Sequence, residues 1–149
     1  MSPLIKVLRV FPFVFLLSFD SGNIAREDNT ITIGTYSYDD IKDITIKWDD
    51  IFAMTPRNYF VYFYSPYCGH CQSIKDLVIN YSKCGGTPMY FVEVSTEVVI
   101  AEDTHLTIGA TSIEQLWILG YPSLLKIESG VVVVNIAGAN AIKEILLYK

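Results

Sequence analysis

The sequence is poor in the features that mark several common classes of protein. It has three cysteines and two histidines in 149 residues, which is too few for a disulfide-stapled scaffold. It contains no glycine-rich phosphate-binding loop and no nucleophilic-serine motif. Eleven basic residues against 16 acidic ones give a formal charge of −5, and an acidic chain of this kind is a poor binder of nucleic acid.

The sequence also lacks a hydrophobic run of the roughly 20 residues that a comfortable membrane span needs. Lys6 and Arg9 precede a shorter apolar run at residues 10–19, a pattern typical of a secretory signal. No clean small-x-small cleavage site follows. We therefore interpret residues 1–22 as a signal peptide or an uncleaved amino-terminal anchor, with residues 4–19 as the possible membrane tether.

Either interpretation places the rest of the chain in the secretory pathway, the endoplasmic-reticulum lumen or another extracytoplasmic space. Hydrophobic residues make up 51% of the chain and charged residues 18%, which argues against disorder. The length leaves room for one domain with a sizeable core. Residues 23–37 are rich in small polar residues and are predicted to be a linker, and residues 38–149 are predicted to form the domain.

The most informative feature that is present is a pair of cysteines two residues apart, Cys68 and Cys71. They follow an aromatic and β-branched run at residues 59–64, which is typical of a buried strand. A Ser-Pro turn signal separates the run from the cysteines. We therefore expect a strand, a turn and then a helix over residues 68 to about 82, with both cysteines in its first turn.

This placement predicts thiol chemistry. The thiolate is the nucleophile in disulfide exchange, and the free N–H groups and positive dipole end at a helix N-terminus stabilise it, so Cys68 is expected to attack. Cys71 comes round to the same face, where it can close a disulfide or release a mixed one. When protonated, His70 adds positive charge beside the Cys68 sulfur and is expected to favour its thiolate.

Two other interpretations of this cysteine pair remain open from the residues alone. The pair can be half of a zinc site, for which Cys84 and His105 are the only other cysteine and histidine. It can also be a purely structural disulfide, although so short a loop constrains the unfolded chain little. We predict Cys84 to be a small, partly buried hydrophobic residue, with a regulatory or intermolecular role as the alternative.

Strands and helices are expected to alternate along the rest of the domain. Residues 95–111 are too long for an ordinary loop and are expected to carry some secondary structure. This order predicts an α/β class, with a central mixed sheet of four or five strands and helices on both faces. The other predicted elements are an edge strand at 41–46, a short helix at 48–54, a strand at 89–94, a helix at 113–119, a hairpin of strands 124–127 and 131–136, and a last helix at 139–148.

Three separated segments resemble the thioredoxin-like superfamily and, within it, the protein disulfide isomerase type with a Cys-Gly-His-Cys motif. Residues 63–71 look like the isomerase active-site segment. Residues 120–125 look like the cis-proline loop and the strand after it, and Gly138 matches the glycine before the last helix. The resemblance covers about residues 38–149 and implies a thioredoxin fold.

The resemblance also implies a function. The implied function is thiol-disulfide exchange on exported protein or peptide substrates, catalysed by an oxidoreductase. Such an enzyme works with a redox partner protein and needs no cofactor or metal. Cys68 would exchange with the substrate and Cys71 would resolve the mixed disulfide, tuned by the histidine between them. Pro122 would lie beside Cys68, the backbone of Tyr121 would pair with an extended substrate peptide, and Tyr67 would contribute to an apolar rim.

Several positions depart from the family pattern or have a second interpretation. Tyr62 stands where the family usually has a buried acid, and a phenol with an ordinary pKa near 10 is a poor proton acceptor. Turnover is therefore expected to be slow, and a non-catalytic binding or adaptor module is the alternative function. Glu93 is expected to be solvated rather than to replace that acid. Asp76 replaces a proline that commonly kinks the active-site helix, and Trp117 is assigned to the substrate rim or to the core.

Overall fold

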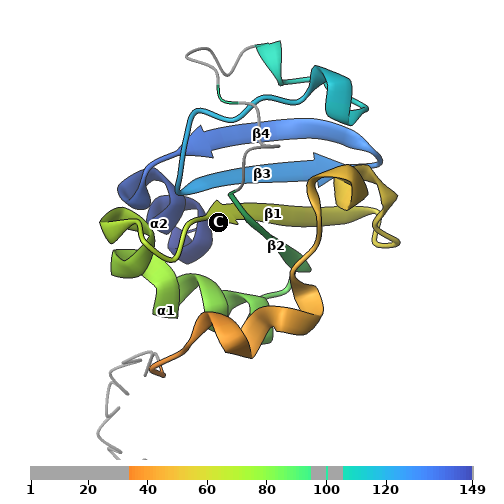
Figure 1. Cartoon of the computed structure of the whole chain (residues 1–149). Coiled ribbons are helices and arrows are strands. Elements are labelled where there is room, and N and C mark those ends of the chain that lie inside the picture. Colours follow the sequence, from red (N-terminus) through yellow and green to blue (C-terminus); the bar gives the residue numbers. More distant parts are fainter. Residues whose placement is uncertain (1–33, 95–99, 101–105, 149) are drawn as a thin grey trace, which may run out of the picture. The chain divides into compact units, whose positions relative to one another are not determined.

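The sheet at the centre of the molecule has four strands. The computed structural model of the chain describes residues 34–94, 100 and 106–148, and in this part the strands are joined in the order β2-β1-β3-β4 (Figure 1). β1 is parallel to β2, β3 is antiparallel to both β1 and β4, and the expected mixed sheet is confirmed. The strands are β1 (Asn58–Tyr64), β2 (Met89–Glu93), β3 (Ser123–Glu128) and β4 (Val131–Ala137).

Strand β1 is buried on both sides because it lies between two other strands and both faces of the sheet are covered. All its residues except Asn58 are buried, which explains the unbroken aromatic and β-branched run. Successive side chains point to opposite faces. Phe60, Tyr62 and Tyr64 therefore enter one hydrophobic cluster, and the intervening residues 59, 61 and 63 enter the other.

The first cluster lies under the two long helices, α1 (Gly69–Cys84) and α2 (Ala139–Tyr148). Ile74 and Val78 of α1 meet Ile142 and Leu146 of α2 in this cluster, at the three- and four-residue spacing that gives a helix one apolar face. The last helix therefore buries Ile142 and Leu146 as expected, with Ile145 partly buried against the same cluster.

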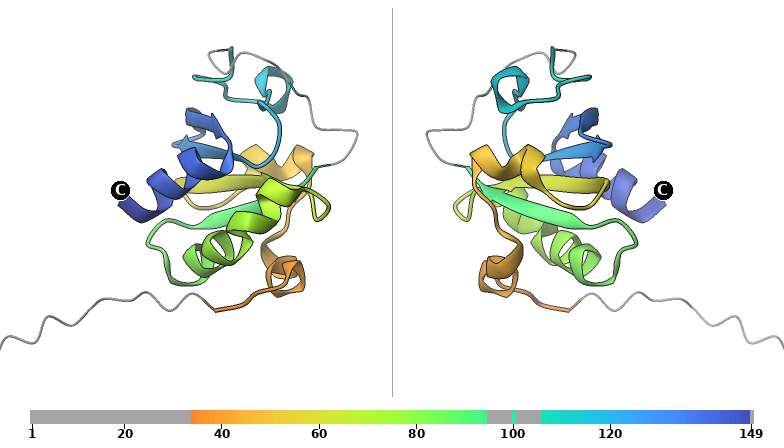
Figure 2. Two further views of the ribbon diagram at one scale, coloured as in Figure 1. Left: turned by 90° about the vertical axis from the view of Figure 1, so that its left-hand side faces the viewer. Right: turned by 90° about the vertical axis from the view of Figure 1, so that its right-hand side faces the viewer.

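The second cluster is covered by short 3-10 helices rather than by long α-helices. The turn η2 (Trp48–Ala53) contributes Trp48 and Ile51, and Leu116 follows the single turn η4 (Ile113–Gln115). Figure 2 shows η2 and η4 on the side of the sheet opposite α1. The prediction of helices on both faces is confirmed, although those on the second face are short.

The predicted edge strand at residues 41–46 is wrong. These residues belong mostly to a 3-10 helix, η1 (Tyr38–Ile44), which Ser37 and Asp40 cap reciprocally. Only the end of the segment reaches the sheet, where Thr45 forms an isolated parallel bridge with Phe91. The local cap outweighs the strand preference of the β-branched residues, and the sheet has four strands rather than five.

The predicted helix at residues 113–119 is also wrong beyond its first turn. Trp117 leaves the helical path because its backbone N–H donates to the Thr107 hydroxyl at 3.1 Å, and its carbonyl oxygen accepts from the same hydroxyl at 2.7 Å. Ile118 then forms a bridge with Ile100. A buried threonine therefore replaces the hydrogen bonds that would have continued the helix.

The remaining element predictions agree with the structure, apart from those that fall outside the described residues. The helix at 48–54, the strand at 89–94, the hairpin and the last helix correspond to η2, β2, β3–β4 and α2. Most of residues 95–111, and the segments interpreted as a signal peptide or anchor and as most of the linker (residues 1–33), lie outside the described residues. Within the described part, no helix is both long and apolar enough to cross a membrane.

Candidate active site

The cysteine pair lies where β1 turns into α1. Cys68 is the N-cap residue of α1, and its sulfur accepts a hydrogen bond from the backbone N–H of Cys71 at 3.4 Å. The Cys68 N–H donates to the Ser65 carbonyl at 3.1 Å, which closes the turn between strand and helix. The predicted placement of both cysteines at a helix start is confirmed, and both are free thiols in this structure.

The two thiols differ sharply in exposure. Cys68 is partly exposed, whereas Cys71 is fully buried in the first hydrophobic cluster. Burial raises the pKa of the Cys71 thiol to about 12, against the lowering effect of a backbone hydrogen bond at Ser65. Of the two, only Cys68 can therefore meet a large substrate, whereas Cys71 is held as a thiol near neutral pH.

The cis-proline loop lies against this pair although it is 53 residues away in the chain. The Tyr121-Pro122 peptide bond is cis, and the Cys68 thiol donates to the Tyr121 carbonyl oxygen at 3.8 Å. Pro122 is buried, whereas Tyr121 is 43% exposed. The structure therefore brings the loop of Tyr121 and Pro122, two of the three predicted substrate-binding residues, beside Cys68.

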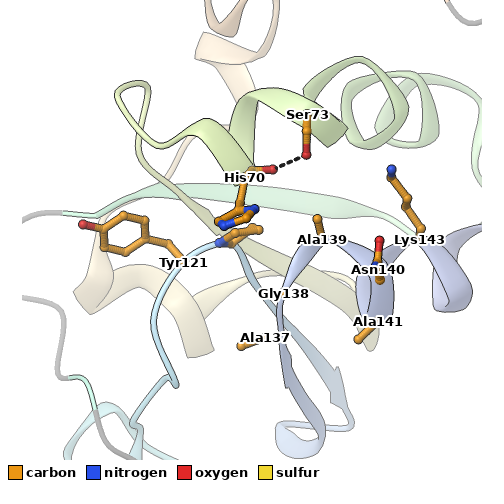
Figure 3. Close-up of a pocket in the computed structure, with 10 residues that line it drawn as sticks. His70, Ser73, Tyr121, Ala137, Gly138, Ala139, Asn140, Ala141 and Lys143 are labelled. Atoms are coloured by element: carbon orange, nitrogen blue, oxygen red, sulfur yellow. Dashed lines mark hydrogen bonds between the residues drawn. The ribbon is translucent and has the colours of Figure 1, made fainter.

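An open groove of about 400 Å³ runs from this loop to the start of α2. Figure 3 shows His70 and Tyr121 at one end of it and Asn140 and Lys143 at the other. His70 lies in the first turn of α1, and its side chain faces the groove. Its backbone carbonyl accepts a hydrogen bond from the Ser73 hydroxyl at 2.8 Å. Sequence reasoning missed Asn140 and Lys143, because nothing in their local pattern distinguishes them from ordinary surface residues of a helix.

Two residues that were assigned to an apolar rim do not line this groove. Tyr67 is 96% exposed and projects from the turn before Cys68. Trp117 is partly buried behind the Thr107 hydrogen bonds and takes no part in the groove or in the buried clusters.

Tyr62 occupies the buried position behind the cysteine pair. It is fully buried, and burial together with the charge of Cys71 raises the pKa of its phenol well above the ordinary value of 10. Glu93 is exposed, as expected, and no Asp or Glu is buried among residues 34–94, 100 and 106–148. Tyr62 therefore cannot be a proton acceptor at neutral pH, and in the described part no buried carboxylate takes its place.

Cys84 is exposed at the last residue of α1, and the prediction that it is partly buried is wrong. The helix ends there at Gly85, beyond the stretch that packs on the sheet. Thirteen residues of helix at about 1.5 Å each separate Cys84 from Cys71 by about 20 Å, so it cannot join the pair around one zinc ion within a chain. His105 lies outside the described residues, and within them no group of three His, Cys, Asp or Glu side chains is arranged to hold a metal ion.

The difference in exposure gives a first prediction. When the folded, reduced protein is treated with a small alkylating reagent, Cys84 and Cys68 should be modified well before Cys71 because the reagent cannot reach a buried thiol. Peptide mass spectrometry after a time course would measure this order. In urea all three cysteines should react alike, and early modification of Cys71 in the folded protein would contradict its burial.

The fold and the paired cysteines define a protein of the thiol-disulfide oxidoreductase class built on a thioredoxin fold. The family model described as Thioredoxin matches residues 41–148, and the chain belongs to this family. Its activity class, exchange with protein thiols and disulfides, follows from that membership. Membership of the wider thioredoxin-like superfamily, inferred from three short segments, is thereby confirmed.

Solved thioredoxin structures are among those that are similar to this chain. Thioredoxin f2 from Chlamydomonas reinhardtii is 20% identical, with a TM-score of 0.48 over 70% of this chain and 91% of that one. Thioredoxin from Plasmodium falciparum is 21% identical, with a TM-score of 0.46 over 68% of this chain and 94% of that one. No curated protein matches the sequence.

Proposed function

We propose that this protein is a thiol-disulfide oxidoreductase of the disulfide isomerase type that acts on exported proteins through Cys68 and Cys71. The observation that carries the proposal is the position of Cys68. Its partly exposed sulfur caps α1 and lies 3.8 Å from the Tyr121 carbonyl oxygen, with the buried Cys71 directly behind it. A substrate strand laid along residue 121 would bring its sulfur to Cys68.

The exchange runs in two steps. The Cys68 thiolate attacks one sulfur of a substrate disulfide, the substrate S–S bond breaks, and the other substrate sulfur leaves as a thiolate. Cys71 then loses its proton and attacks the Cys68 sulfur, so that the Cys68–Cys71 disulfide forms and the substrate leaves with both cysteines reduced. Run in reverse, the same steps oxidise a substrate dithiol, and a redox partner protein resets the pair.

The Cys-Gly-His-Cys sequence supports the isomerase type. His70 is exposed on the groove beside the Cys68 turn, where its imidazolium would stabilise the Cys68 thiolate and so make the disulfide more oxidising. Measuring the reduction potential together with oxidative refolding and insulin reduction tests the proposal. A potential in the isomerase range with measurable refolding is expected. A very reducing potential with inert kinetics would instead favour a binding or adaptor module.

We further propose that residues 1–22 export the domain, either as a cleaved signal or as an anchor. The supporting pattern is the pair Lys6 and Arg9 before the apolar run at residues 10–19. Expressing the full chain in a secreting host and determining the mature amino terminus by mass spectrometry distinguishes the two. Retention of an intact chain in the cytosol would refute export.

The charge of the groove predicts which substrate peptides react fastest. Lys143 and His70 line it, and none of the described residues that line it is acidic, although the chain as a whole is acidic. Peptides with Asp or Glu near the reacting cysteine should therefore be favoured. Lys143→Glu should lower kcat/KM for such peptides by about three- to tenfold, an effect that shrinks at high salt.

The control for this prediction is Lys47→Glu, which makes the same charge change at an exposed residue outside the groove. It should leave the preference unchanged. If both substitutions alter the rate equally, the effect comes from net charge rather than from the groove.

A further inference from the structure

Two phenol hydroxyls beside the resolving cysteine are buried without a hydrogen-bond partner among the described residues. They belong to Tyr62 and Tyr38. A hydroxyl buried in this way destabilises the fold, and phenylalanine would fill nearly the same space without that penalty. Packing alone therefore does not explain why these two residues are tyrosines.

Both phenols share a hydrophobic cluster with Cys71. Tyr62 comes from β1, Tyr38 from η1 and Cys71 from α1, and all three pack in the first hydrophobic cluster. The ring of Tyr64 stacks on Tyr38 at 4.2 Å and on Tyr62 at 6.2 Å between ring centroids. After burial, electrostatic repulsion from an ionised Cys71 is the largest cause of the raised pKa of both phenols, and neither hydroxyl is hydrogen-bonded to the protonated sulfur in this structure.

The other ionisable groups around this site do not compete for the role. Cys68 raises the pKa of both phenols, Asp76 of α1 raises the pKa of Tyr38, and Glu93 of β2 raises the pKa of Tyr64. Both carboxylates reach solvent, and Asp76 accepts a hydrogen bond from the Tyr36 N–H at 2.9 Å. From β3, Lys126 lies over the Phe60 ring of this cluster, with its Nζ 5.9 Å from the ring centroid, and α2 contributes Ile142 and Leu146.

Resolution requires a thiolate at a buried position. A thiol is a weak hydrogen-bond acceptor, whereas a charged acceptor makes bonds about twice as strong as a neutral one. The raised pKa of each phenol keeps it protonated near neutral pH. Two neutral O–H donors are therefore available beside Cys71, and they gain a strong acceptor only when Cys71 loses its proton.

We propose that Tyr62 and Tyr38 are positioning residues for resolution, whose hydroxyls donate hydrogen bonds to the Cys71 sulfur as its thiolate forms. The Cys71 proton leaves to solvent base, and both phenols keep theirs. The Cys71 sulfur then attacks the Cys68 sulfur, an S–S bond forms between them, and the sulfur bound to Cys68 leaves as a thiolate. The inference deepens the proposed function, but its test needs no protein substrate.

The test separates attack from resolution with dithiobisnitrobenzoate, in a Cys84→Ser background that leaves only the active pair. Attack by Cys68 releases one coloured nitrobenzoate thiolate and leaves the other on Cys68. Attack by Cys71 releases the second, so stopped-flow absorbance shows the two steps as two phases. Tyr62→Phe should leave the first phase unchanged and slow the second about tenfold, the loss expected for a hydrogen bond to a charged group.

Three further readouts distinguish this role from a structural one. The pH at which the second phase reaches a given rate should rise by about one unit in Tyr62→Phe, since a tenfold lower thiolate fraction corresponds to one pKa unit. Tyr38→Phe should act in the same direction. The urea midpoint of Tyr62→Phe should rise, because an unsatisfied buried hydroxyl is removed.

The matched control is Tyr64→Phe, which makes the same change on the same strand at a residue whose hydroxyl is not one of the buried, unpartnered phenols. Its second phase should match that of the parent. An unchanged second phase in both Tyr62→Phe and Tyr38→Phe overturns the inference, as does equal slowing in Tyr64→Phe. The parent protein can show both phases with this reagent, and Tyr62→Phe can slow the second, while the parent fails to exchange disulfides with protein substrates. In that case the proposed function fails and this inference stands.

Discussion

Replacing Cys71 by alanine should turn a transient mixed disulfide into a stable one. Cys68 stays partly exposed at the N-cap of α1, so it still attacks a substrate disulfide. The only buried thiol behind it in the described part of the chain is gone, and the covalent complex cannot resolve within the molecule. Non-reducing electrophoresis with mass spectrometry should show substrate joined to this variant through Cys68.

The complementary change is Cys68→Ala, which removes the attacking sulfur. Exchange should fall on the order of a thousandfold or more, as it does when the nucleophile of a catalytic unit is removed. Cys84→Ser should keep normal turnover, because that thiol lies about 20 Å away along the helix. Failure of Cys71→Ala to trap any substrate, under either oxidising or reducing conditions, would refute the division of roles between the two cysteines.

Replacing Phe91 by alanine should have the largest effect on stability. Phe91 is fully buried in β2, and its ring meets the edges of Tyr62 and Tyr64 at 5.6 and 6.2 Å between centroids. A Phe-to-Ala change in a packed core costs about 3–5 kcal/mol in the free energy of unfolding. Because a domain of this size has a total of about 5–15 kcal/mol, much of its stability should be lost.

Urea denaturation followed by circular dichroism measures that loss. The control is Val133→Ala on β4, a residue that is 40% exposed, for which the cost should stay below about 1 kcal/mol. The Phe91→Ala variant should also show slower resolution, since its ring supports Tyr62 beside the cysteine pair. Equal urea midpoints for the two variants would contradict the central place of Phe91 in the core.

The elements that sequence predicted well are those whose signal is local and strong. The run at residues 59–64 is typical of a strand buried on both faces, and the helix after it was predicted from the turn that follows the run. The hairpin and the last helix were predicted for the same reason. The position of the cysteine pair at the start of a helix was predicted from the strand and the turn before it alone.

The predictions that failed depended on contacts that local pattern does not contain. The segment 41–46 has β-branched residues, but the reciprocal cap between Ser37 and Asp40 holds most of it in a 3-10 helix. The helix at 113–119 stops after one turn because Thr107 binds the backbone of Trp117. Cys84 was predicted to be partly buried, and only the packing of α1 on the sheet shows that its last residue is exposed.

By itself the sequence indicated thiol chemistry, because the spacing of Cys68 and Cys71 and the strand and turn before them are local facts. Only the tertiary structure decided which thiol is accessible, since exposure depends on what packs around each sulfur. It also decided that Tyr121 reaches Cys68 and that Tyr38 and Tyr62 share a hydrophobic cluster with Cys71. Those contacts join residues far apart in the chain, and burial of the apolar faces of the sheet and helices brings them together.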